Sequence, residues 1–137
     1  MFVVATANDV SRLPPEFTRK GRFDETFFVG LPSSDERKAV WNVHLRRPRK
    51  AIPKFDVERL VTLSEGFTGA EIAEAVVTGM YLAFEDNYRA VSQSDMEQGL
   101  RESVPLSRSH AGLLSRLTIW GAHFAVPASR ATTDGRR

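Results

Sequence analysis

The chain has 137 residues, with 19 Lys and Arg against 17 Asp and Glu, 42% hydrophobic residues and no cysteine. This balance is typical of a soluble globular protein and excludes a disordered or fibrous one. The lack of cysteine excludes disulfides and thiolate chemistry and fits a reducing compartment. No apolar run approaches the ~20 residues of a membrane span, and three histidines without a dense carboxylate cluster give no candidate metal site.

The charges divide the chain into two parts. Residues 1–54 carry 11 basic and 6 acidic side chains, whereas residues 55–125 carry 5 basic and 10 acidic ones. Such asymmetry predicts two units with different surfaces. The basic front half is of the kind that faces phosphate, nucleic acid or an acidic partner.

Two short strands are predicted at the start of the chain. Residues 2–7 are apolar without alternation, which is typical of a parallel strand covered on both faces. Residues 25–29 form the second strand, which ends before Gly30 and Pro32. Because two strands cannot form a sheet with two covered faces, we expect most of the sheet to be missing from this chain or supplied by another.

Helical signals follow from Ser33 onward. Asp56 is a candidate helix cap, and three capping boxes predict further helix starts, at Ser33-x-x-Glu36, Thr68-x-x-Glu71 and Ser92-x-x-Asp95. The helix from Thr68 to about Phe84 is apolar nearly all round, so it is predicted to be the central buried helix. Residues 113–124 repeat apolar side chains at three- and four-residue spacing and predict a last amphipathic helix.

Motifs that precede and follow these helix starts point to one family. Val4–Asp9 ends a strand in Asn, and Arg19-Lys20-Gly21-Arg22-Phe23-Asp24 follows about a dozen residues later. Leu31-Pro32, a helix ending in His44, and Gly66-Phe67-Thr68-Gly69-Ala70-Glu71-Ile72 come next. In this order and spacing, residues 2–125 resemble the carboxyl-terminal part of an AAA-type ATPase module. The resemblance is closest to bacterial and plastid-encoded AAA proteins of poorly defined role.

The resemblance implies an α/β fragment, the last strands of a P-loop NTPase sheet, followed by an all-α helical lid. Residues 1–32 would be the end of the large subdomain, 33–125 the lid, and 126–137 a disordered tail. Asn8 follows the first predicted strand, and a polar residue at the carboxyl end of such a strand faces the crevice where α/β sheets bind ligands.

The resemblance implies catalytic roles for three residues within the segment 1–32. Asn8 matches the sensor-1 residue, which contacts the γ-phosphate or the attacking water. Arg19 and Arg22 match arginine fingers, which act on a neighbouring subunit's nucleotide and suit phosphate because a guanidinium stays charged and offers a donor fork. The alternatives are a turn-forming Asn and a solvated basic loop.

Three residues of the predicted lid receive nucleotide-binding roles. His44 matches a histidine near the adenine, and Gly69 and Ala70 match the small pair beside the base and ribose. The alternatives are a helix-terminal His bonded to backbone and a plain capped helix start. The basic stretch Arg46–Lys54 is interpreted as a solvated linker, because it has no interleaved aromatic and contains two prolines.

The intact family binds ATP with Mg²⁺, hydrolyses it and remodels protein substrates, usually as a hexameric ring of AAA subunits. This sequence has no Gly-x-x-x-x-Gly-Lys-Ser/Thr and no apolar strand ending in Asp-Glu. We therefore expect a truncated or split module that is inactive alone and supplies sensor 1, trans arginine fingers and a lid. The alternatives are a non-enzymatic module that binds an intact AAA partner, nucleic-acid binding through the basic linker, and a gene remnant. The predicted location is the cytoplasm, or the plastid stroma in a photosynthetic eukaryote.

Overall fold

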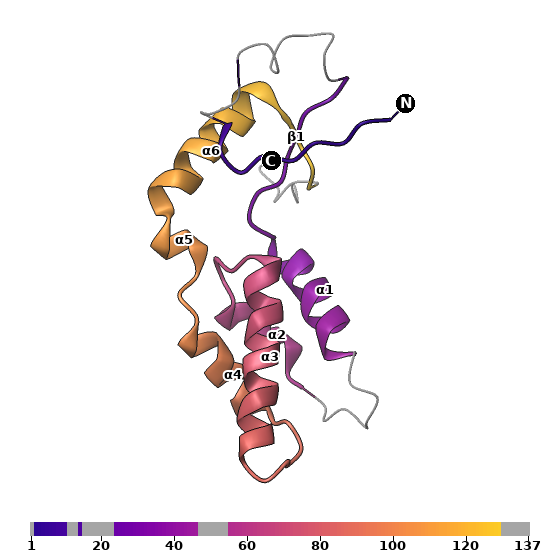
Figure 1. Cartoon of the computed structure of the whole chain (residues 1–137), viewed down its shortest axis with the longest axis vertical. Helices are drawn as coiled ribbons and strands as arrows, with labels where there is room; N and C mark the ends of the chain where they lie inside the picture. The colour runs from indigo at the N-terminus through magenta and orange to yellow at the C-terminus, as the bar shows by residue number, and fades with distance from the viewer. Residues whose placement is uncertain (1, 11–13, 15–23, 47–54, 130–137) are drawn as a thin grey trace, which may run out of the picture. The chain divides into compact units, whose positions relative to one another are not determined.

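The structure is a computed structural model that describes residues 2–10, 14, 24–46 and 55–129 (Figure 1). The chain forms two compact units. One contains Leu31–Ala111, and the other combines the described parts of Met1–Gly30 and Gly112–Arg137. No helix among the described residues is long and apolar enough to cross a membrane.

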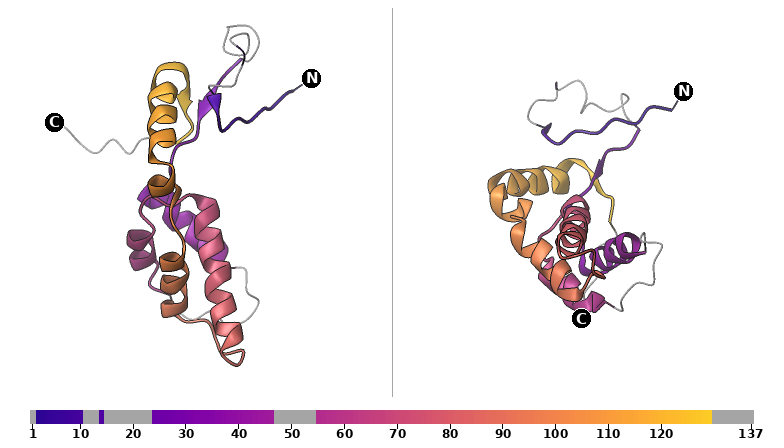
Figure 2. Two further views of the ribbon diagram at one scale, coloured as in Figure 1. Left: turned by 60° about the vertical axis from the view of Figure 1, so that its left-hand side comes forward. Right: turned by 60° about the horizontal axis from the view of Figure 1, so that its bottom comes forward.

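In the unit of residues 31–111, all the described secondary structure is helical. Its helices are α1 (Ser34–Leu45), α2 (Val57–Leu63), α3 (Gly69–Glu85), α4 (Gln93–Glu102) and the single turn α5 (Leu106–Ser109). Helix α3 packs against α1 and α4, and α2 packs against the same two helices (Figures 1 and 2). The predicted all-helical lid is therefore confirmed as a fold, with α3 at its centre.

The four helix starts predicted from the sequence are confirmed. Ser33 and Thr68 form complete capping boxes with Glu36 and Glu71, in which side chain and backbone bond reciprocally. The Asp56 carboxylate accepts the backbone N–H of residue 59 at the start of α2. At α4 the backbone N–H of Ser92 donates to the Asp95 carboxylate at 2.8 Å. Each cap satisfies backbone donors that the first helical turn leaves without an acceptor.

The core of the helical unit is built around completely buried side chains. Trp41, Leu60 and Ile72 are 0% exposed, and Met96 from α4 is 1% exposed. The indole N–H of Trp41 donates to Ser64 Oγ at 3.0 Å, and that hydroxyl donates onward to the Leu60 carbonyl at 2.7 Å. The polar edge of the tryptophan is thus satisfied inside the core, as a buried donor requires.

Two glycines allow α3 and α4 to approach closely. A Cβ at Gly99 would lie 2.3 Å from the Ala75 carbonyl oxygen, and a Cβ at Gly79 would lie 2.4 Å from the end of Met96. Any side chain at these positions would force the two helices apart. Helix α3 is central to the unit, as predicted, but it is buried on one face only, because its far face carries exposed apolar residues, among them Val77 and Phe84.

The second unit contains a short parallel ladder and a helix. Strand β1 (Phe27–Phe28) pairs with β2 (Val126–Pro127), with Phe27 opposite Val126. Helix α6 (Ala111–Phe124) enters this unit at Gly112 and places Gly121 against Phe28, where a Cβ would lie 2.5 Å from the ring. The compact units therefore group most of α6 with the strands, whereas the sequence placed residues 33–125 in one helical domain.

Two details of the predicted strands differ from the structure. Residues 2–7 form no strand, and their side chains are exposed, with Phe2 at 94%. Backbone of this kind is held in a sheet only by neighbouring strands, and the described residues contain just the β1–β2 ladder. The segment from residue 126 was predicted to be a disordered tail, but its first two residues, Val126–Pro127, form strand β2 and pair with β1.

Candidate functional site

The predicted site residues fall into three groups in the structure. Asn8 is exposed and lies at a bend in the unit that contains β1 and α6. Arg19 and Arg22 lie outside the described residues. His44, Gly69 and Ala70 belong to the helical unit, and the structure places only these three in one compact body.

The start of α3 is the best-defined part of the candidate site. Gly69 and Ala70 are its first two residues, directly after the cap Thr68. The helix itself offers no acceptor for their N–H groups, which lie at the positive end of the helix dipole. Ala70 is exposed and Gly69 partly exposed. Small side chains therefore leave the backbone at this helix start open to a polar or anionic ligand.

Helix α1 lies beside this helix start. A Cβ at Gly69 would lie 3.9 Å from Val40 Cγ2, which is ordinary van der Waals contact. His44 is one turn further along α1 on the face of Val40, and it is partly buried. The structure therefore brings His44, Gly69 and Ala70 onto two packed neighbouring helices.

Glu71 links the helix start to a distant segment, which the sequence did not reveal. Its Oε2 accepts the backbone N–H of Thr68 at 2.7 Å, and its Oε1 accepts the N–H of Leu106 at 2.7 Å. The turn before α3 also lies close to α5, because a Cβ at Gly66 would be 2.4 Å from Ser107 Oγ. Gly66 has a φ of +79°, so both its backbone conformation and this close contact favour glycine. The capping box identified Glu71 as a cap, but its second partner depends on tertiary packing.

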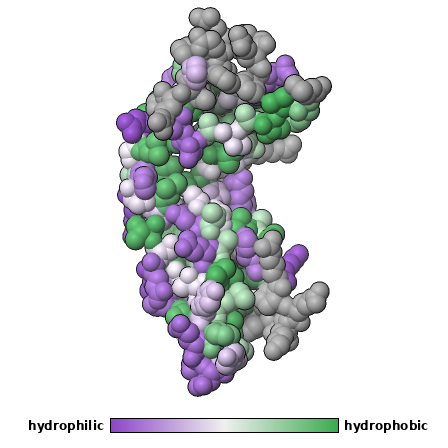
Figure 3. Space-filling model, in the orientation of Figure 1, coloured by the Kyte–Doolittle hydropathy of each residue, from purple (hydrophilic) through white to green (hydrophobic). Residues whose placement is uncertain are grey.

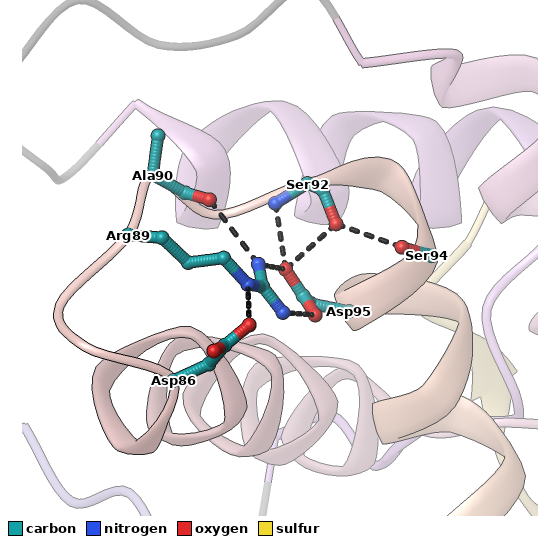
Figure 4. Close-up of polar contacts among 6 residues, drawn as sticks. All are labelled: Asp86, Arg89, Ala90, Ser92, Ser94 and Asp95. Atoms are coloured by element: carbon teal, nitrogen blue, oxygen red, sulfur yellow. Dashed lines mark hydrogen bonds and ion pairs between the residues drawn. The ribbon is translucent and has the colours of Figure 1, made fainter.

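A partly buried ion pair joins the turn after α3 to α4 (Figure 4). The Arg89 guanidinium donates to both Asp95 oxygens, at 2.5 and 2.7 Å, and to Asp86 at 2.6 Å. Hydrogen bonds from Arg89, followed by those from Ser92, hold the pKa of Asp95 well below its usual range despite its burial. Its hydrogen bonds to Asp95 and then to Asp86 raise the pKa of Arg89. The capping box of α4 predicted the role of Asp95, but nothing in the sequence singled out Arg89.

His44 lies in the last turn of α1, and Gly69 and Ala70 begin α3, which packs against α1. Within the described residues there is no group of three or more His, Asp or Glu side chains placed to hold a metal ion.

The sequence matches known proteins over most of its length. Residues 54–98 match the family described as the AAA+ lid domain. The chain is 43% identical over 123 residues to the "Uncharacterized AAA domain-containing protein ycf46" of Guillardia theta, and 42% identical over 123 residues to that of Trieres chinensis. Each match covers 89% of this chain and 24% of the relative. The "Proteasome-activating nucleotidase" of Aeropyrum pernix is 35% identical over 94 residues, which is 69% of this chain and 23% of the relative.

A solved structure supports the fold. The chain resembles the crystal structure of the FIGL-1 AAA domain with a TM-score of 0.62 and 22% sequence identity, over 83% of this chain and 41% of that one. The chain therefore spans about a quarter of the length of its curated relatives. Together the lid match, the relatives and the fold show that this chain belongs to the AAA family and corresponds to the carboxyl-terminal part of the AAA module.

Proposed function

We propose that this chain supplies the lid and accessory catalytic residues of an AAA ATPase site. The observation that carries the proposal is the AAA+ lid match at residues 54–98, on a bundle whose α3 starts with the open pair Gly69–Ala70. In this proposal His44, Gly69 and Ala70 contact the base and ribose of ATP, and Asn8 acts as sensor 1. Arg19 and Arg22 stabilise charge on the phosphates of a neighbouring subunit's nucleotide, a role worth about 10³–10⁵ in rate in related systems.

The partners in this proposal are other AAA subunits in a ring, and the ring uses ATP hydrolysis to remodel a protein substrate. Support comes from the relatives, one of which is named a proteasome-activating nucleotidase. The 137 residues contain no Gly-x-x-x-x-Gly-Lys-Ser/Thr sequence, so in this proposal another segment or chain holds the ATP phosphates and Mg²⁺. The proposed location is the cytoplasm or the plastid stroma.

A chimera tests the catalytic part of the proposal. The chain replaces the matched 94-residue region of the Aeropyrum pernix relative, and ATP hydrolysis is measured by phosphate release. We expect turnover that falls at least about 100-fold with Arg22→Ala and with Arg19→Ala, because each removes charge stabilisation in the transition state. Arg116→Ala, which changes an exposed arginine of α6, is the matched control. An active chimera that tolerates both finger substitutions would refute the assignment of Arg19 and Arg22.

The isolated chain provides a second test. We expect it to show no ATP turnover, and Arg22-dependent hydrolysis by the 137 residues alone would contradict the proposal. The alternative of a non-enzymatic module that binds an intact AAA partner is favoured by the exposed apolar residues of the unit that contains β1 and α6, including Phe2, Val3 and Val4. Binding to an intact relative that leaves its ATP turnover unchanged and is insensitive to Arg22→Ala would favour that alternative.

Binding of nucleic acid through Arg46–Lys54, which lies mostly outside the described residues, stays the less favoured proposal.

A further inference from the structure

One face of α3 carries an exposed apolar ridge that the proposed nucleotide site does not use. Its residues are Val77, Met80, Tyr81, Phe84 and Tyr88, which are 43–77% exposed. Those from Val77 to Phe84 lie at three- and four-residue spacing and so form a single row along the helix. Tyr88 lies in the turn that follows, where its ring contacts Phe84. Figure 3 shows green apolar residues exposed among purple hydrophilic ones on the face where α3 lies. We call these five residues the α3 ridge.

The carboxyl-terminal end of the α3 ridge is held rigidly. The rings of Phe84 and Tyr88 meet edge to face with centroids 4.5 Å apart. Asn87 and Tyr88 both have positive φ angles, of 51° and 57°, which are uncommon for residues with a side chain. Arg89 holds this turn through its bonds to Asp86 and to Asp95 of α4 (Figure 4). A binding surface that is already ordered loses less conformational entropy when a partner docks.

The charged residues of helix α3 itself are all acidic. Glu74 and Glu85 are exposed and lie along the same edge of the ridge. Helix α3 contains no Lys or Arg. The nearest cation in the sequence, Arg89, is paired with Asp86 and Asp95, whereas neither glutamate forms an ion pair in the described part of the chain. The edge therefore attracts a basic partner.

We propose that the α3 ridge binds an amphipathic helix of a partner protein that carries Lys or Arg along one edge. A row of side chains at helical spacing packs into the grooves of another helix. Tyr81, Phe84 and Tyr88 are of the aromatic type that dominates binding energy at interfaces, and Met80 adapts to irregular contacts. The acidic edge selects the basic helix and sets its direction, since the carboxylates line only one side of the ridge.

A synthetic peptide tests the proposal on the full 137-residue chain. The probe is an 18-residue helical peptide with Leu at positions three and four apart and Lys along one edge of the leucine stripe. We expect binding in the range of about 10–100 μM by calorimetry, with amide NMR shifts centred on residues 77–88. Tyr81→Ser and Phe84→Ser should each weaken binding at least about tenfold. The double variant Glu74→Lys and Glu85→Lys should weaken it by a similar factor and remove its salt dependence.

Matched controls distinguish specific binding at the α3 ridge from non-specific binding of the peptide elsewhere on the chain. Val43→Ser changes a 55% exposed valine of α1, and Glu102→Lys changes an exposed carboxylate of α4; neither should alter binding. Equal binding of a peptide with Glu in place of Lys, or NMR shifts away from residues 77–88, would overturn the proposal. Dimerisation of the chain that Phe84→Ser abolishes would also overturn it, because the occupant would then be a second copy. The test uses no nucleotide, so its outcome is independent of the proposed ATPase role.

Discussion

The guanidinium of Arg89 forms two hydrogen bonds with the carboxylate of Asp95, one to each oxygen, and so joins the turn after α3 to the first turn of α4. Asp95 is 5% exposed and also accepts the N–H and the hydroxyl of Ser92. One carboxylate thus caps α4 and fixes the preceding turn. Because charge-assisted bidentate pairs are geometrically specific, this contact determines how the end of α3 is presented.

Replacing Asp95 should destabilise the helical unit. Asp95→Asn keeps the size of the side chain but removes the charge and one acceptor, leaving donors of Ser92 and Arg89 poorly matched. We expect the free energy of unfolding to fall by roughly 1–3 kcal/mol, measured by urea denaturation followed by circular dichroism. Glu85→Gln, on the exposed surface of α3, is the control and should change it by less than about 0.5 kcal/mol. Equal effects of the two substitutions would contradict the structural role of Asp95.

The stability of the helical unit should decrease in acid. The pKa of Asp95 is depressed mainly by hydrogen bonds from Arg89, and that of Glu97 mainly by a hydrogen bond from Arg59. The folded state therefore binds protons less readily than the unfolded chain, whose carboxyl pKa values are about 4. The stabilisation is complete above about pH 5 and is lost as the pH falls through about 4 towards the depressed folded values. Urea midpoints between pH 7 and pH 3 measure this loss.

The Asp95→Asn variant supplies the control for the acid effect. Because the asparagine does not titrate, its urea midpoint should depend less steeply on pH below about 5 than that of the unchanged chain. An equally steep pH dependence in both proteins would assign the acid effect to other carboxyl groups.

The close approach of α3 and α4 at Gly99 gives a prediction with an internal control. Gly99→Ala would place a methyl group 2.3 Å from the Ala75 carbonyl oxygen, so the helices must separate. We expect a loss of about 1–3 kcal/mol in unfolding free energy. Gly112→Ala makes the same change in α6, where a Cβ has no neighbour within 4 Å, and should stabilise by up to about 1 kcal/mol. Thermal and urea denaturation of both variants would check the opposite signs.

The contact between Glu71 and Leu106 predicts a local effect on hydrogen exchange. Glu71→Ala removes the acceptor of the Leu106 amide, 35 residues away in the sequence. We expect the amides at the start of α5 to exchange at least about tenfold faster, because they lose their tie to α3. Glu74→Ala, one turn along the same helix and exposed, should leave them unchanged. Exchange at Leu106 that is the same in both variants would show that other contacts hold α5.

A substitution at Gly69 tests the proposed nucleotide contact separately from folding. Its Cβ would make only an ordinary contact with Val40, so Gly69→Ala should fold normally and gain up to about 1 kcal/mol of helix stability. If the base and ribose approach this backbone, the added methyl group should weaken ATP binding by the chimera several-fold, measured with a fluorescent ATP analogue. Unchanged ATP affinity in a normally folded variant would argue against nucleotide contact at Gly69.

The local elements of the helical unit were largely predictable from the sequence. Ser33, Asp56, Thr68 and Ser92 each begin the predicted helix, because capping depends on side chains within three residues of the helix start. The motifs between Val4 and Ile72, taken in order, also identified the family correctly, since they combine residue type with fixed spacing. These signals are short-range, and a single sequence contains them in full.

The tertiary structure decided what depends on partners far apart in the chain. Residues 2–7 have the composition of a buried strand, yet they are exposed, because a strand needs neighbours that composition does not provide. Apolar residues surround α3, and only packing showed that Ile72 is buried while Phe84 is exposed. The pairing of β1 with β2, the contact of Glu71 with Leu106 and the clamp of Arg89 on Asp95 likewise depend on which segments meet in space. The sequence by itself determined where the helices begin and to which family they belong, and the tertiary structure decided which of their faces are left for a partner.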